Sequence, residues 1–259
     1  LNPNEPQFKP NLSKSERIRF GWLGGSSHIK DIELLKDMPQ KVSGFNDKVQ
    51  FVLCGFDTRG NVRAFNQETQ QWMERPMQPI ETTWFMYEIF ITDNFRLLEK
   101  HSDYLKHLLK FDSQLPYNDK DMPYRRIWTK SIETYAKGYN EFDVALAPLV
   151  ETSFNKYKSQ LKIIEAGFHK KAIIAQNYGP YTIDLISAIE KGGGFNDAGN
   201  ALLVDPSKNH KQWSQHVKRL VDNPNLVKDL GEKLYETVKD TYNLNNVTKD
   251  RAEIYKTLI

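Results

Sequence analysis

The sequence predicts an open α/β fold: a doubly wound, mostly parallel sheet of about six strands, with helices on both faces and a helical carboxy-terminal tail. Two observations carry this prediction. Short apolar runs without polar alternation, typical of strands buried on both faces, recur along the chain between segments of helical spacing. Beyond Pro206 the spacing is helical throughout. Strands and helices that alternate in this way predict parallel βαβ units in one sheet.

The elements follow in order along the chain. Strands are expected at residues 17–23, 49–54, 125–128, 143–149, 171–175 and 201–204. A helix is expected around Ile32, and others are expected at 132–139, 159–168, 181–190, 210–221, 226–241 and 247–258, with a polar loop at 151–157.

The domain organisation is simple. Residues 1–16 hold Pro3, Pro6 and Pro10 and are expected to form a linker or arm, because proline interrupts regular helix. Residues 17–259 are expected to form a single domain, with an insertion at about 61–123 that is helical in its second half, around 94–110. No internal repeat or low-complexity tract interrupts this pattern.

Composition narrows the classes of protein. With 36 Lys plus Arg against 33 Asp plus Glu and 39% hydrophobic residues among 259, the chain is not of the disordered type. A net charge of +3 gives no support to nucleic-acid binding, and no apolar run reaches the roughly 18 residues of a membrane span. The single cysteine, Cys54, lies in an apolar run and favours a reducing, cytoplasmic location.

The first candidate binding element is the loop Gly24-Gly25-Ser26, which follows the first strand and opens a helix. Small residues there let backbone N–H groups approach an anion such as a phosphate. The same residues are also ordinary turn and helix-capping residues, so both interpretations stay open. The loop lacks the GxGxxG and GxxxxGK[ST] spacings, which argues against a dinucleotide-dependent dehydrogenase and a P-loop NTPase.

A second candidate is the charged stretch from Asn155 to Gly167. On a helix, Lys158, Lys162 and Glu165 share one face, while Leu161, Ile164 and Phe168 mark the buried side. Two cations beside the start of a helix suit a diphosphate, together with the N–H of Ser159, and a carboxylate deeper along the face can accept from vicinal ribose hydroxyls. The alternative is a solvated face with a Lys162–Glu165 ion pair.

Weaker candidates lie elsewhere. His28 and Asp31 can reach the same cleft, although a histidine in a polar loop is often merely solvated. Gly179, Pro180, Tyr181 and Thr182 follow a strand at the edge where α/β folds bind ligands, and the alternative there is a turn and helix cap. The six histidines and one cysteine show no metal-ligand spacing, so no metal site is predicted. No cofactor is expected either.

The chain resembles the carboxy-terminal, donor-binding half of GT-B glycosyltransferases, in particular the large retaining family 4. The resemblance rests on the run at 143–149, on Asn155-x-x-Lys158-Ser159-x-x-Lys162-x-x-Glu165-Ala166-Gly167, on 172–175 and on 200–206 with the helical run after it. Glu165 matches the second glutamate of that family's E-x7-E motif, which binds the donor ribose. The place of the first glutamate holds Tyr157, and Trp22 stands where many members have an arginine.

The resemblance implies transfer of a hexosyl unit from a UDP- or GDP-sugar to a saccharide or glycolipid acceptor, with retention of configuration. It implies an amino-terminal acceptor-binding half as partner, which the chain is expected to lack, so that the protein alone transfers sugar poorly. The basic sequence pI of about 8.7 tolerates contact with an anionic membrane surface at the inner face of the membrane. A non-catalytic nucleotide-sugar-binding module is the main alternative, and a GT-B-fold sugar-nucleotide epimerase is a third.

Overall fold

The computed structural model describes residues 1–11, 15–36, 38–42, 47–92 and 122–258. The helix expected at 94–110 lies outside the described residues. Among the described helices, none is long and apolar enough to cross a membrane.

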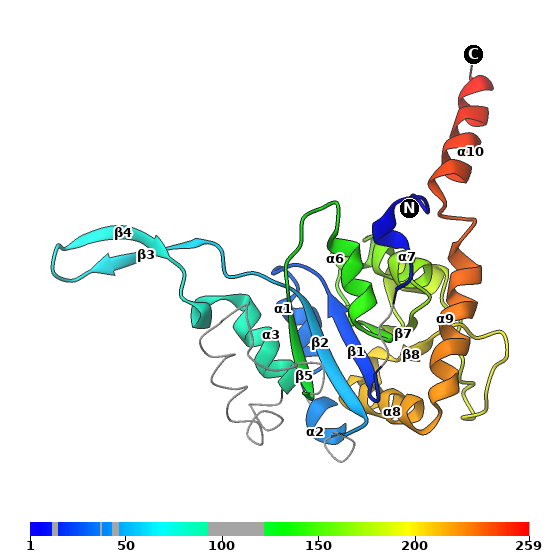
Figure 1. Cartoon of the computed structure of the whole chain (residues 1–259), viewed down its shortest axis with the longest axis horizontal. Helices are drawn as coiled ribbons and strands as arrows, with labels where there is room; N and C mark the ends of the chain where they lie inside the picture. The colour runs from blue at the N-terminus through cyan, green and yellow to red at the C-terminus, as the bar shows by residue number, and fades with distance from the viewer. Residues whose placement is uncertain (12–14, 37, 43–46, 93–121, 259) are drawn as a thin grey trace.

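The centre of the molecule is a six-stranded parallel sheet with the order β5-β2-β1-β6-β7-β8 (Figure 1). All five neighbouring pairs are parallel, as the fold prediction requires. Each predicted strand is confirmed, with its ends within two residues of those expected. The apolar runs identified the strands because runs such as Val144–Ala147 are buried on both faces of the sheet. The strands are β1 (Ile18–Leu23), β2 (Val49–Phe56), β5 (Tyr124–Trp128), β6 (Val144–Ala147), β7 (Ala172–Gln176) and β8 (Leu202–Val204).

Helices cover both faces of the sheet and create two apolar clusters. One cluster packs Trp22 and Leu53 against α1 (Ile29–Glu33), α2 (Met38–Val42), α3 (Thr83–Thr92) and α8 (Asn209–Asp222). The other packs Val52 and Ile173 against the 3₁₀ helix η5 (Tyr135–Glu141), α7 (Leu161–Phe168) and α9 (Pro224–Val238). The final helix, α10 (Leu244–Lys256), has no buried residue and extends away from the body (Figure 1).

Several predicted helices need correction. The helix expected at 159–168 begins at Leu161, and Leu161 is 44% exposed rather than on the buried side. The loop expected at 151–157 contains the short helix α6 (Ser153–Lys156), capped by the Thr152 hydroxyl, which accepts from the N–H of Asn155. The helix expected at 132–139 is the 3₁₀ helix η5 instead.

The helix expected at 181–190 does not form. The structure has the 3₁₀ helix η6 (Gly179–Ile183), after which the chain makes turns and a bridge to Ala201. The reason is a long-range contact, because the Asn200 side chain accepts from the N–H of Ile186 at 2.8 Å and donates to the carbonyl of Asp184 at 2.9 Å. These backbone groups are then satisfied without helix.

The insertion starts with an antiparallel hairpin that sequence periodicity missed. Strands β3 (Asn61–Asn66) and β4 (Gln71–Pro76) project far from the body (Figure 1). Helix α3 follows and returns the chain to the sheet through Glu88, whose carboxylate accepts from Arg126 at 2.6 Å and from the Tyr124 hydroxyl at 2.7 Å. This buried ion pair fixes α3 on β5, which itself leads into the site.

The arm at residues 1–11 packs on the domain. It contains the 3₁₀ helix η1 (Pro6–Phe8), in which Gln7 and Phe8 are buried. The Gln7 carbonyl lies 2.8 Å from Nε2 of His169, the residue that caps the carboxyl end of α7. The arm thus adds a contact to the helix that carries Glu165.

Candidate functional site

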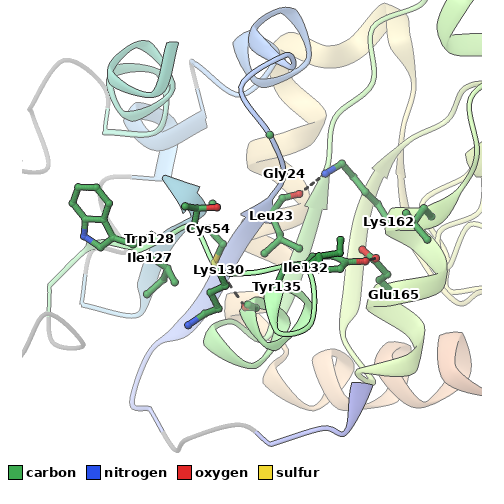
Figure 2. Close-up of a pocket in the computed structure, with 15 residues that line it drawn as sticks. Leu23, Gly24, Cys54, Ile127, Trp128, Lys130, Ile132, Tyr135, Lys162 and Glu165 are labelled. Carbon is green, nitrogen blue, oxygen red and sulfur yellow. Dashed lines mark hydrogen bonds between the residues drawn. The ribbon is translucent and has the colours of Figure 1, made fainter. Parts of the chain in front are cut away.

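A cavity of about 390 Å³ lies where β1, β2 and β5 end, facing α7 and η5 (Figure 2). Ligands of open α/β sheets usually bind at the carboxyl ends of the parallel strands. They bind near the point where strand order changes direction, and here that point lies between β1 and β6: β2 and β5 follow on one side of β1, and β6, β7 and β8 follow on the other. The wall combines apolar side chains with a few polar groups: Leu23, Gly24, Gly25, Cys54, Gly55, Ile127, Trp128, Thr129, Lys130, Ile132, Tyr135, Gly138, Leu161, Lys162 and Glu165.

Glu165 lies at the α7 side of the cavity and is only 3% exposed. The Tyr139 hydroxyl donates to its Oε2 at 3.0 Å, and the Tyr135 hydroxyl donates to its Oε1. Burial raises the pKa of Glu165, although the two tyrosine hydrogen bonds and the charge of Lys162 act in the opposite direction. The carboxylate is therefore an oriented acceptor in a poorly solvated place.

Lys162 lies one turn before Glu165 on the same face of α7. Its Nζ donates to the carbonyl of Leu23 and lies 4.7 Å from the centre of the Trp22 ring. Burial lowers the pKa of Lys162 to about 8, with the charges of Glu165 and Asp31 opposing the shift. At neutral pH the side chain is a partly desolvated cation beside the loop after β1.

Gly24 makes this approach possible. A Cβ at Gly24 would meet the Trp22 ring at 2.5 Å and Nζ of Lys162 at 3.0 Å. Gly55, on the neighbouring strand, has φ +107° and its Cβ would lie 2.4 Å from the Gly24 carbonyl oxygen. Gly25 differs, because nothing lies within 4 Å of where its Cβ would be.

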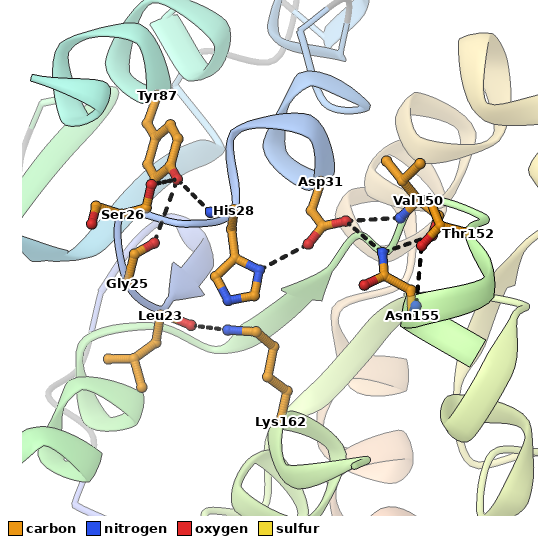
Figure 3. Close-up of polar contacts among 10 residues, drawn as sticks. All are labelled: Leu23, Gly25, Ser26, His28, Asp31, Tyr87, Val150, Thr152, Asn155 and Lys162. Atoms are coloured by element: carbon orange, nitrogen blue, oxygen red, sulfur yellow. Dashed lines mark hydrogen bonds and ion pairs between the residues drawn. The ribbon is translucent and has the colours of Figure 1, made fainter. Parts of the chain in front are cut away.

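Tyr87 of α3 fixes the Gly24-Gly25-Ser26 loop (Figure 3). Its hydroxyl donates to the Ser26 carbonyl at 2.8 Å and accepts from the backbone N–H of His28 at 2.7 Å. The insertion therefore contributes directly to the shape of this loop.

The polar groups next to the loop form a second network (Figure 3). His28 Nδ1 lies 2.8 Å from Asp31 Oδ2, and Asp31 Oδ1 accepts from the N–H of Val150 at 2.8 Å. Asn155 is buried, and its amide donates to the Val150 carbonyl at 2.8 Å. Burial alone would raise the pKa of Asp31, but the hydrogen bonds from His28 and Val150 outweigh it and the pKa is lowered.

The structure places the other predicted residues farther from the cavity wall. Lys158 is half-buried with its Nζ 5.2 Å from the Phe154 ring centre, and Ser159 is exposed. Gly179 (φ +60°) lies against α6, where its Cβ would meet the Asn155 carbonyl oxygen at 3.1 Å. Pro180 and Tyr181 are buried, while Thr182 is exposed with its hydroxyl bonded to the Gly179 carbonyl.

Sequence reasoning missed the tyrosines of η5 and the residues after β5. Tyr135 and Tyr139 precede Glu165 by 30 and 26 positions, so no local spacing connects them to it.

Trp128 lines the cavity, whereas Trp22 is 1% exposed and packs between Trp84, Tyr87 and His28. Among the described residues, no group of His, Cys, Asp or Glu is arranged to hold a metal ion.

Strand order and cavity position together define the class: an open, doubly wound α/β domain with a cavity at the carboxyl edge of the sheet, where such domains bind their ligands. No protein-family model and no curated protein matches the sequence.

Solved structures are more informative. HepE from Anabaena, solved in complex with UDP and glucose, matches with a TM-score of 0.58 and 10% identity over 99% of this chain and 55% of its own. A glycosyltransferase from Rickettsia africae matches with a TM-score of 0.55 and 14% identity over 94% of this chain and 48% of its own. A UDP-forming trehalose-phosphate synthase from Burkholderia vietnamiensis matches with a TM-score of 0.51 and 12% identity over 94% and 46%.

The chain spans about half the length of these solved structures. At such identities the likeness establishes the fold: this chain has the architecture of one Rossmann-like half of a GT-B glycosyltransferase. The fold implied by the sequence resemblance is thereby confirmed, while membership of the retaining family 4 stays a prediction.

Proposed function

We propose that the chain is the donor-binding domain of a glycosyltransferase that moves a hexosyl unit from a UDP- or GDP-sugar to a saccharide or glycolipid acceptor. The observation that carries this proposal is the pairing of Glu165 and Lys162 on the wall of the cavity at the carboxyl edge of the sheet. A buried carboxylate suits vicinal ribose hydroxyls, and a cation beside a glycine loop suits a diphosphate. The volume of about 390 Å³ is in the range of small-molecule sites.

The proposed pose follows from the polarity of the wall. The base lies among Ile127, Trp128 and Ile132, the ribose lies at Glu165, and the diphosphate lies toward the Gly24-Gly25-Ser26 loop and Lys162. HepE, which shares this fold, was solved with UDP and with UDP-glucose, and this supports the uridine donor over the guanosine donor. Lys158 and Ser159 then lie on the diphosphate side of the site, and the residues 179–182 border the transferred sugar.

In this pose the domain acts electrostatically. The glycosidic bond breaks as negative charge grows on the diphosphate, and Lys162 with the loop amides stabilises that charge in a partly desolvated place. The low pKa of Lys162, about 8, still leaves it protonated near neutral pH. A second domain supplies the acceptor site, and retention of configuration follows from the family resemblance.

The alternative is a nucleotide-sugar-binding module without transferase activity. Two observations favour it: Tyr157, at the place of the family's first glutamate, is 82% exposed, and Trp22, at the place of an arginine, is buried. Hydrolysis of UDP-glucose by the protein, alone or with an acceptor-binding partner, would exclude this alternative.

Calorimetric titration with UDP and GDP tests the proposal. Glu165→Ala is expected to weaken binding by about 1–3 kcal/mol because one charge-assisted hydrogen-bond acceptor is lost. Glu253→Ala is the matched control, since Glu253 is an exposed carboxylate on α10 paired with Lys256. Lys158→Ala is expected to weaken binding of UDP and GDP, because a positive charge beside the diphosphate is lost. Unchanged affinity in Glu165→Ala, or no binding of either nucleotide by the unmodified protein, would refute the site.

A further inference from the structure

His28 is held more firmly than a solvated loop histidine would be. Its backbone N–H donates to the Tyr87 hydroxyl at 2.7 Å, and its ring meets the edge of Trp22 with 5.8 Å between ring centres. Nδ1 lies 2.8 Å from Asp31, a side chain that is 7% exposed and is itself fixed by the N–H of Val150. Backbone, ring face and one ring nitrogen are all constrained.

The opposite nitrogen of the ring, Nε2, faces the contact between Leu23 and Lys162 (Figure 3). Within the described part of the chain, Nε2 of His28 has no hydrogen-bond partner, and the side chain is 23% exposed. Figure 3 shows the ring between the Gly25–Ser26 loop and the side chain of Lys162. Trp22 links the two groups, because the same indole contacts the His28 ring and lies 4.7 Å from Nζ of Lys162.

The Asp31 carboxylate determines what Nε2 offers. In the neutral ring the single proton stays on Nδ1, where it is shared with Asp31, and Nε2 presents a lone pair that repels an anion. In the protonated ring Nε2 becomes an N–H donor, and a charge-assisted bond to a phosphate oxygen forms. A phosphate at this place and a proton on Nε2 therefore stabilise each other.

We propose that His28, positioned by Asp31, is a diphosphate-binding residue whose Nε2–H contacts the donor only when the ring is protonated, so that affinity for the diphosphate falls as pH rises. The proposal rests on the proposed function, since it takes a nucleotide sugar as ligand. It makes His28 the cation on the β1 side of the diphosphate, opposite Lys162 of α7, at a site where Trp22 occupies the family's arginine position.

Other charged groups near the ring act at different pH. Asp31 stays ionised, because its pKa is lowered, and Tyr87 of α3 stays neutral, because burial raises its pKa. The pKa of Lys162 on α7 is lowered only to about 8. Lys158, just before the same helix, carries a positive charge that helps to lower the pKa of Asp31. Lys162 keeps most of its charge up to pH 7.5, so its titration does not account for a tenfold change in affinity below that pH.

The test compares ligands with and without a diphosphate by calorimetry at pH 5.5, 6.5 and 7.5. UDP-glucose and GDP-glucose carry a diphosphate without a titrating proton in this range, and uridine and guanosine carry none. The ratio of the affinity for the nucleotide sugar to the affinity for its nucleoside is expected to fall about tenfold from pH 5.5 to 7.5, because both ligands meet Glu165 and only the nucleotide sugar meets His28. His28→Gln is expected to abolish this slope and to keep the nucleoside affinity.

Two further variants make the result specific. Asp31→Asn is expected to move the fall in affinity to lower pH, a shift that a purely structural loss would not give. His210→Gln changes an exposed histidine on α8 and is expected to keep the full slope. A slope that persists in His28→Gln overturns the proposal for His28 while nucleoside binding still supports the donor site. Absence of nucleoside and nucleotide binding overturns both.

Discussion

Replacing Tyr135 with Phe is expected to tighten nucleoside binding, whereas the same change at Tyr139 is not. Both hydroxyls donate to Glu165, one to each carboxylate oxygen. Tyr135 also lines the cavity, so its hydroxyl occupies a place that a ribose hydroxyl needs. Tyr139 is 2% exposed, is stacked on His169 and is absent from the cavity wall. No ligand hydroxyl can therefore take the place of the Tyr139 hydroxyl at Glu165.

The magnitudes follow from the hydrogen bonds. A bond to a charged acceptor is worth about 1.5–3 kcal/mol. In the unmodified protein a ribose hydroxyl displaces the Tyr135 hydroxyl from Glu165, and the loss of the tyrosine bond offsets part of the gain. In Tyr135→Phe the ribose supplies the missing donor, so uridine affinity is expected to rise by about 1.5 kcal/mol, roughly tenfold. Tyr139→Phe is expected to lower the free energy of unfolding by about 1.5–3 kcal/mol with no gain in affinity.

Calorimetry with uridine and 2′,3′-dideoxyuridine measures the effect, with urea unfolding of each variant beside it. The gain in Tyr135→Phe should disappear with the dideoxy nucleoside, because that ligand cannot donate to Glu165. If folded Tyr135→Phe bound uridine no better than the unmodified protein, the hydroxyl would be a support of the carboxylate and the exchange argument would be wrong.

Three stability predictions follow from other contacts, each measured by urea unfolding. Gly24→Ala is expected to lose about 1–3 kcal/mol because its Cβ would lie 2.5 Å from the indole beneath it, whereas Gly25→Ala, with open space, should be neutral. Glu88→Gln leaves the buried Arg126 guanidinium without its carboxylate and should cost about 3–5 kcal/mol; a loss under 1 kcal/mol would contradict this. Burial lowers the pKa of Lys171 to about 8, so the unfolded state binds more protons above that pH and unfolding free energy should rise between pH 7.5 and 9.5. Lys171→Met should reduce that rise, and an unchanged slope would refute the assignment.

The sheet could be predicted because its strands are apolar on both faces, a signal that needs no knowledge of partners. Strands β3 and β4 gave no such signal, since both faces of the hairpin are largely exposed. The helix expected at 181–190 failed because Asn200, far along the chain, binds the backbone there. Local spacing could identify Glu165 and Lys162 on one helix, but their surroundings come from long-range contacts, such as Asp31 with Val150 at a separation of 119 residues.

Helix α3 has a consequence for how the insertion can vary. Its adjacent residues Tyr87 and Glu88 reach two different walls of the cavity, the first through the loop after β1 and the second through β5. Surface insertions usually change length freely, because little else depends on them. Here α3 is bonded to both the loop after β1 and strand β5, so a shortened or displaced 57–92 segment would loosen both walls of the cavity at once. Variants of the protruding hairpin that shift α3 are thus expected to change nucleotide affinity without touching a cavity residue.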